Sequence, residues 1–121
     1  MFIAANLLVA FVGLLHFHFL ALEMFLWQKP LGLKTFKNTP EKAEITAVLA
    51  ANQGLYNGFL AAGLTCCHIF ADPLLSYAFQ VFFLTCVIVA GIYVAFSVSR
   101  SILWIQAAPA VAALIIILMR A

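Results

Sequence analysis

His16 and Glu23 are two of the three ionisable residues in the apolar N-terminal segment, and they are seven residues apart. A helix turns by about 100° per residue, so both residues share one face, two turns apart. A carboxylate at the centre of a bilayer costs about 2.5 kcal/mol or more, and such groups usually mark a functional site. Glu23 and His16 are therefore candidates for a general acid and base, or for a ligand anchor. The structural alternative is that Glu23 extends toward the following lysines while His16 bonds across helices.

A second polar group lies in the apolar stretch between residues 50 and 63. On a helix, Asn52, Gln53 and Tyr56 share one face and Asn57 lies at its edge. Amides in hydrocarbon persist where a helix, a water molecule or a ligand pairs with them. We therefore expect these four residues to line a cavity and to orient a polar head group, facing His16 and Glu23. The alternative is that they join helices, at only about 0.6 kcal/mol per hydrogen bond.

The opposite face of the same helix carries small residues. Gly54 and Gly58 have the GxxxG spacing that lets two helices approach closely. This glycine face should pack against a neighbouring helix or a second protomer.

Tyr93 and Gln106 are further candidates for ligand contacts, from the third and fourth apolar segments. At about 1.5 Å per residue, both lie within roughly 10 Å of the same membrane interface as Glu23. The intramembrane polar groups thus converge on one half of the bilayer, which favours a polar pocket there over scattered helix contacts.

The run Cys66, Cys67 and His68, with Asp72 nearby, resembles a set of metal ligands. Adjacent residues on a helix diverge by about 100° and rarely bind one ion together, so no metal site is predicted. Nothing in the sequence identifies a cofactor.

Composition places the chain in a bilayer. Of its 121 residues, 67% are hydrophobic and 8% are charged, with a mean hydropathy of +1.16. Too few polar side chains are present to coat a soluble domain. The net charge of +2 comes mainly from lysines in one connection, which gives no support to a nucleic-acid surface.

Four apolar segments predict an all-α, four-transmembrane-helix bundle that forms a single domain over residues 1–121. The expected helices span about 2–27, 40–70, 73–98 and 102–119. Thr39 with Pro40, and Asp72 with Pro73, are typical helix starts. The connection over residues 28–44, in which the second helix starts at Pro40, is expected to form an extramembrane loop. Pro109 should bend the last helix.

Basic residues predict the orientation of the chain. Lys29, Lys34, Lys37 and Lys42 lie in the first connection and Arg100 in the third, whereas the opposite side has only Arg120. Under the positive-inside rule, both termini then lie outside the cytoplasm. Trp27 and Trp104 fall at the same cytoplasmic interface, where aromatic residues are enriched.

Four segments together resemble a family of small bacterial membrane proteins known as domain of unknown function 1304. They are LLHFHFLALEMFLW (Leu14 to Trp27), LAANQGLYNGFLAAGL (Leu49 to Leu64), FFLTCVIVAGIY (Phe82 to Tyr93) and QAAPA (Gln106 to Ala110). The resemblance implies four membrane helices and a multi-pass protein of the bacterial cytoplasmic membrane, and it brings no established activity. A fainter similarity is to the trimeric membrane glutathione transferases, which use several arginines to bind glutathione. In this chain only Arg100 lies near the predicted cytoplasmic side, which argues against glutathione chemistry.

The leading functional hypothesis is a site for a small lipophilic molecule with a polar head, with acid–base catalysis by Glu23 and His16 left open. Membrane lipid and a second copy of the chain are the other expected partners. One alternative is a small transporter or permease component. Another is a structural or accessory subunit that assembles through the glycine face.

Overall fold

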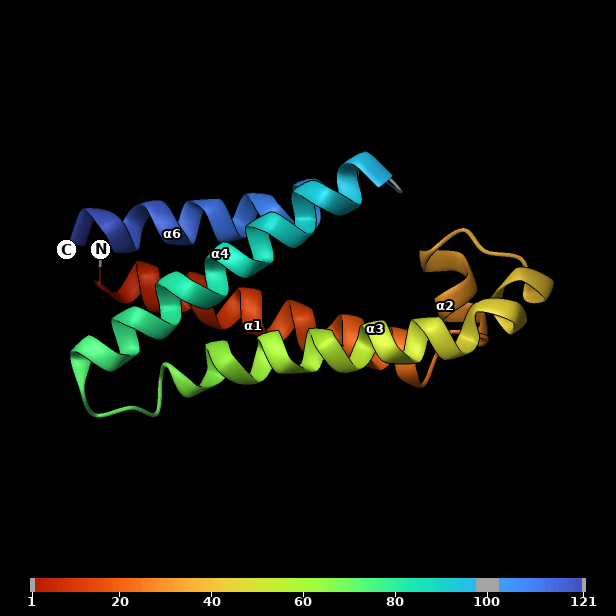
Figure 1. The fold of residues 1–121 in the computed structure, drawn as a ribbon, viewed down its shortest axis with the longest axis horizontal. Coiled ribbons are helices and arrows are strands. Elements are labelled where there is room, and N and C mark those ends of the chain that lie inside the picture. The colour runs from red at the N-terminus through yellow and green to blue at the C-terminus, as the bar shows by residue number, and fades with distance from the viewer. Residues whose placement is uncertain (1, 98–102, 121) are drawn as a thin grey trace. The chain divides into compact units, whose positions relative to one another are not determined.

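The computed structural model describes residues 2–97 and 103–120, and every element in these ranges is helical (Figure 1). The elements are α1 (Phe2–Met24), α2 (Pro30–Thr35), α3 (Pro40–Cys66), α4 (Pro73–Ser97), the π-helical segment η1 (Leu103–Ala107) and α6 (Ala108–Arg120). The all-α fold class is confirmed for the described residues. Arg100, on which part of the orientation prediction depends, lies outside them.

Both predicted helix starts are present. At the start of α3, the Thr39 hydroxyl oxygen accepts a hydrogen bond from the Lys42 amide at 3.2 Å. At the start of α4, the Asp72 carboxylate accepts one from the Leu74 amide at 3.0 Å. In each case the side-chain oxygen accepts a hydrogen bond from a backbone N–H of the first helical turn, which has no acceptor within the helix.

Two helices end earlier than the apolar pattern predicts. α1 ends at Met24 instead of Trp27, and α3 ends at Cys66 instead of Phe70. Beyond Met24 the indole N–H of Trp27 donates to the Thr46 hydroxyl at 3.2 Å, which holds Trp27 against the start of α3. Hydropathy identifies the apolar residues, but it does not show where a side-chain contact such as this one ends a helix.

The prediction of a simple loop over residues 28–39 was wrong, because this connection contains α2. Pro30 takes the first helical position, where its missing N–H costs no hydrogen bond. The helix ends at Thr35. Two residues later Lys37 has a left-handed φ of 53°, and the Asn38 amide donates to the Leu33 carbonyl at 2.9 Å, as is typical of a helix C-terminus.

Two helices are long and apolar enough to cross a membrane. They are α1, over Ile3–Met24, and α4, over Pro73–Val94, and a shorter apolar stretch covers Trp104–Met119. At 27 residues, α3 is about 40 Å long, but its amides and glycines make it less apolar.

The chain divides into two compact units. The large unit contains residues 1–15 and 60–121, and the small unit contains residues 16–59, so α1 and α3 contribute to both. Gly91 of α4 lies close to Ala107 in the large unit, where an added Cβ would be 2.9 Å from the Ala107 Cβ. The absence of a side chain at Gly91 therefore lets α4 approach η1.

The π-helical segment η1 ends at Ala107, two residues before Pro109. Proline has no N–H to donate to the carbonyl four residues earlier, that of Ile105, so regular α-helical bonding cannot continue through this turn. A π-helical turn is one way in which a helix accommodates such a change. The structure shows a change from π-helix to α-helix next to Pro109, and the predicted bend stays a prediction.

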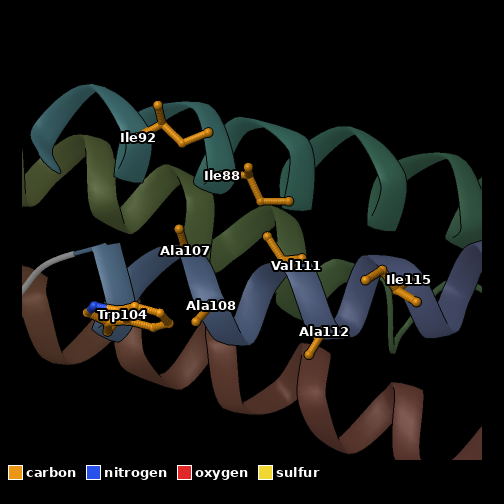
Figure 2. A pocket seen from close by; sticks show the side chains of 8 residues that line it. All are labelled: Ile88, Ile92, Trp104, Ala107, Ala108, Val111, Ala112 and Ile115. Carbon is orange, nitrogen blue, oxygen red and sulfur yellow. The ribbon is translucent and has the colours of Figure 1, made fainter. Parts of the chain in front are cut away.

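An apolar groove of about 420 Å³ lies between α4 and the η1–α6 segment of the large unit (Figure 2). Its lining residues are Ile88, Ile92, Trp104, Ala107, Ala108, Val111, Ala112 and Ile115. This groove offers contact area to a hydrocarbon chain but almost no polar atoms to orient a head group.

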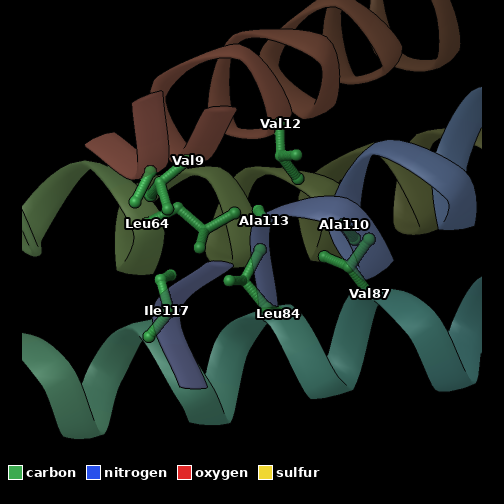
Figure 3. Close-up of a cluster of buried hydrophobic side chains, with 9 residues drawn as sticks. Val9, Val12, Leu64, Leu84, Val87, Ala110, Ala113 and Ile117 are labelled. Carbon is green, nitrogen blue, oxygen red and sulfur yellow. The ribbon is translucent and has the colours of Figure 1, made fainter. Parts of the chain in front are cut away.

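The core of the large unit is built from small and branched aliphatic side chains of α1, α3, α4 and α6 (Figure 3). It comprises Ala5, Val9, Val12, Leu64, Leu84, Val87, Ala110, Ala113 and Ile117. None of the predicted site residues belongs to this cluster.

Candidate functional site

The candidate site is centred on Glu23, near the C-terminal end of α1 in the small unit. The Asn57 side-chain amide of α3 donates a hydrogen bond to Oε1 of Glu23, with 2.5 Å between the two atoms. Both side chains are half-buried. Among the described residues, no lysine or arginine pairs with Glu23, so an amide is the partner of this carboxylate.

Two glycines bring α3 close enough to α1 for the short Asn57 side chain to reach Glu23. A Cβ at Gly54 would lie 2.6 Å from Cγ of Met24 and 3.1 Å from Cβ of Glu23. A Cβ at Gly58 would lie 2.6 Å from Cδ1 of Leu20. The GxxxG spacing therefore serves a contact between two helices of the same chain.

The remaining residues of the predicted pocket wall lie elsewhere on α3. Asn52, Gln53 and Tyr56 are exposed, and the Tyr56 ring contacts the Phe59 ring edge-on. Of the four residues that were expected to face Glu23, only Asn57 contacts it. The physical reason is that the glycine face occupies the side of α3 next to α1.

His16 is fully buried, and its ring contacts Phe19 edge-to-face at 5.7 Å. Seven residues separate it from Glu23, which corresponds to about 10 Å along the helix axis. General acid–base transfer requires hydrogen-bond reach or a single bridging water. His16 and Glu23 could therefore exchange a proton only through a bound molecule or a chain of hydrogen bonds.

The other two candidates belong to the large unit. Tyr93 lies on α4 and is strongly exposed, whereas Gln106 lies in η1 and is buried. The site that the structure assembles within one unit therefore consists of Glu23 and Asn57, with the two glycines behind them.

Residues 10–118 match the family model described as "Protein of unknown function (DUF1304)". The chain belongs to the DUF1304 family. The match includes both Glu23 and Asn57, as well as the residues on which the sequence resemblance rests. No curated protein and no solved structure matches this DUF1304 chain.

The described part of this DUF1304 chain holds no group of three His, Cys, Asp or Glu side chains close enough to bind one metal ion. Cys66, Cys67 and Cys86 are free thiols. The sulfur of Cys67 donates instead to the carbonyl of Gly63, one helical turn earlier, at 3.3 Å.

Gln80, a buried amide on α4 of the large unit, was not among the residues predicted from the sequence. Its exposed fraction is 2%, and its Oε1 accepts no hydrogen bond within the described residues. Gln80 lies one turn before the core residue Leu84. The signal was available, because Gln80 is a lone amide in a long apolar segment.

Replacing Gln80 with leucine should stabilise the large unit by about 1–2 kcal/mol, because a buried acceptor without a partner carries a desolvation cost. Unfolding in mixed micelles by increasing SDS checks this expectation. Gln80→Ala is the matched control, since it removes the amide but leaves a cavity and should not stabilise. Destabilisation by Gln80→Leu would show that the Gln80 amide has a hydrogen-bond partner.

Proposed function

We propose that the chain is a multi-pass protein of a bacterial cytoplasmic membrane, with α1, α3, α4 and the η1–α6 segment as four spans. The length and apolar character of α1 and α4 support this, as does the apolar stretch Trp104–Met119. The helix α3 has the length that a span requires. The lysines of the first connection support an orientation with both termini outside the cytoplasm.

Within this architecture, the protein binds a small lipophilic molecule through Glu23 and Asn57. The observation that carries the proposal is the hydrogen bond from Asn57 to a half-buried carboxylate inside an apolar helix. A carboxylate there is costly unless it is satisfied, and intramembrane carboxylates usually serve a function. One amide donor uses only part of the acceptor capacity of Glu23, because a carboxylate has about four lone-pair sites.

The ligand that fits has a head group that donates hydrogen bonds, such as a primary amine or a hydroxyl. Its donors would pair with the acceptor sites of Glu23 that Asn57 leaves unused, and an ammonium would add a charge-assisted bond. A hydrocarbon tail would remain in the surrounding bilayer. Asn57 would fix the orientation of the carboxylate and so the direction from which the head approaches.

Binding is favoured over catalysis, because the geometry holds one reactive group at Glu23 and places His16 two turns away. Assembly through the glycine face is not favoured either. Gly54 and Gly58 already pack against Met24 and Leu20 of the same chain, so this face is not available to a partner.

Quenching of Trp27 fluorescence by a brominated dodecylamine tests the proposal. Trp27 follows Glu23 by four residues, and a Trp104→Phe background makes it the sole tryptophan. The wild type should show saturable quenching, and Glu23→Gln should raise the Kd about tenfold or more, because a bond to a charged group is lost. Glu44→Gln, which removes an exposed carboxylate of α3, is the matched control and should not change the Kd. Equal, unsaturable quenching in all three proteins would mean partitioning into lipid and would refute the site.

A further inference from the structure

We infer that two copies of this chain pair in the membrane through an exposed seam on α3, an inference that rests on the proposed four-span architecture. The seam consists of Ile45, Leu49, Asn52, Tyr56 and Phe59. It lies on the side of α3 away from the glycines, so pairing would leave the contact between α1 and α3 intact.

The seam has the spacing of a helix-pairing surface. Its successive members are four, three, four and three residues apart, which is the heptad pattern of two helices that pack side by side. All of them are exposed: the exposed fractions are 82% for Ile45, 67% for Leu49, 61% for Tyr56 and 55% for Phe59, and Asn52 is exposed as well.

Polar side chains distinguish this seam from an ordinary lipid-facing surface. Asn52 and the adjacent Gln53 have no side-chain hydrogen bond with any described residue. An amide that faces hydrocarbon loses the hydrogen bonds that it makes in water. A partner that supplies donors and acceptors at the depth of Asn52 removes this cost.

A second copy meets this requirement by symmetry. Identical chains insert in the same direction, so a two-fold axis along the membrane normal makes the two α3 helices parallel. Asn52 then meets Asn52, and an amide can both donate and accept. A single asparagine at a seam position of a coiled coil also fixes the register of the two helices.

The charges of α3 are compatible with this pairing. Its acidic and basic residues, Glu41, Lys42 and Glu44, lie before the seam begins at Ile45. The seam itself is neutral. Lys42 continues its spacing three residues before Ile45, but it is exposed near the start of α3, where water and salt screen the repulsion between two lysines.

Cysteine cross-linking in native membranes tests the inference, in a background with Cys66, Cys67 and Cys86 replaced by alanine. Asn52→Cys and Tyr56→Cys should each give a disulfide-linked dimer on mild oxidation. Leu14→Cys is the matched control and should stay monomeric. Leu14 is an exposed residue of α1, about 15 Å from the Met24 end, and Asn52 lies about 18 Å from the start of α3. Failure of both seam positions to cross-link, or equal cross-linking at Leu14, would overturn the inference.

Dilution of donor- and acceptor-labelled chains in phosphatidylcholine vesicles gives a second readout that retains the native cysteines. Asn52→Leu should weaken dimerisation about threefold to tenfold, which is the range for one interhelical hydrogen bond. Asn52→Asp should weaken it further, because two carboxylates would meet. A wild-type chain that remains monomeric at high density in the vesicles would contradict the inference.

Two controls separate this inference from the proposed function. Glu23→Gln should keep the wild-type dimer fraction, because Glu23 lies on the α1 side of the small unit. A membrane-impermeant maleimide should not label Asn52→Cys. Labelling from the aqueous phase would overturn both the membrane-embedded seam and the four-span architecture, whereas a monomer that binds amphiphile normally would overturn the seam alone.

Discussion

Gly32→Ala is expected to destabilise the small unit by about 3 kcal/mol. An alanine Cβ at this position of α2 would lie 1.9 Å from the carbonyl oxygen of Leu26 and 3.0 Å from that of Trp27. Both neighbours are backbone atoms, so the clash cannot be relieved by a change of rotamer. Added volume at a close contact typically costs 1–3 kcal/mol, and the rigidity of backbone places this case at the upper end (about 3 kcal/mol).

The readout is the emission of Trp27 in the Trp104→Phe background. The Trp27 ring packs against Phe36 at 4.9 Å, so displacement of α2 should shift its emission to the red. Gly13→Ala is the matched control, since its added Cβ would make ordinary contacts at 3.5 Å or longer. Alanine has the higher helix propensity, so Gly13→Ala should be neutral or slightly stabilising. An unchanged emission and unfolding midpoint in Gly32→Ala would contradict the packing of α2.

Asn57→Leu is expected to destabilise the contact between α1 and α3 by about 2 kcal/mol. The substitution removes the amide that donates to Glu23 and leaves the half-buried carboxylate without a donor. Hydrogen bonds to charged groups contribute about 1.5–3 kcal/mol, and an abandoned buried charge adds its desolvation cost. SDS titration in mixed micelles measures the change in the free energy of unfolding.

A double-mutant cycle isolates the pair. Glu23→Leu removes the carboxylate, so the double variant should recover most of the stability that Asn57→Leu alone loses. The coupling free energy is then clearly different from zero. Strictly additive effects of the two substitutions would show that Asn57 and Glu23 do not interact.

The sequence predicts the helices well where local chemistry defines them. Thr39 with Pro40, and Asp72 with Pro73, each combine a capping side chain with a proline, and both starts are correct. The helix α2 was missed because Pro30 and Gly32 are also typical of loops. In the structure the Gly32 backbone lies close to the Leu26 carbonyl, and a local residue pattern does not reveal this approach.

The sequence separates two faces of α3 but does not assign their partners. Helical periodicity puts Gly54 and Gly58 on one side and Asn52 with Tyr56 on the other. Which side meets α1 depends on how closely two backbones can approach, and this depends on Leu20 and Met24 as much as on the glycines. The edge position of Asn57 is the detail that allows it to reach Glu23 while the other amides remain exposed.

Gln80 shows a different limit. Segment averages identify α4 as an apolar span and so conceal the one amide within its buried stripe. The criterion that singled out Asn52, Gln53 and Asn57, an amide in an apolar segment, applies equally to Gln80.

Photo-crosslinking with a diazirine-labelled dodecylamine tests the site at Glu23 most directly, because mass mapping reports where the amphiphile is held. The account predicts that the label falls on the C-terminal part of α1 and the central part of α3, near Glu23 and Asn57, and that Glu23→Gln abolishes it. Label that falls instead in the apolar groove around Ile88 and Trp104, or that is unchanged in Glu23→Gln, would contradict the account.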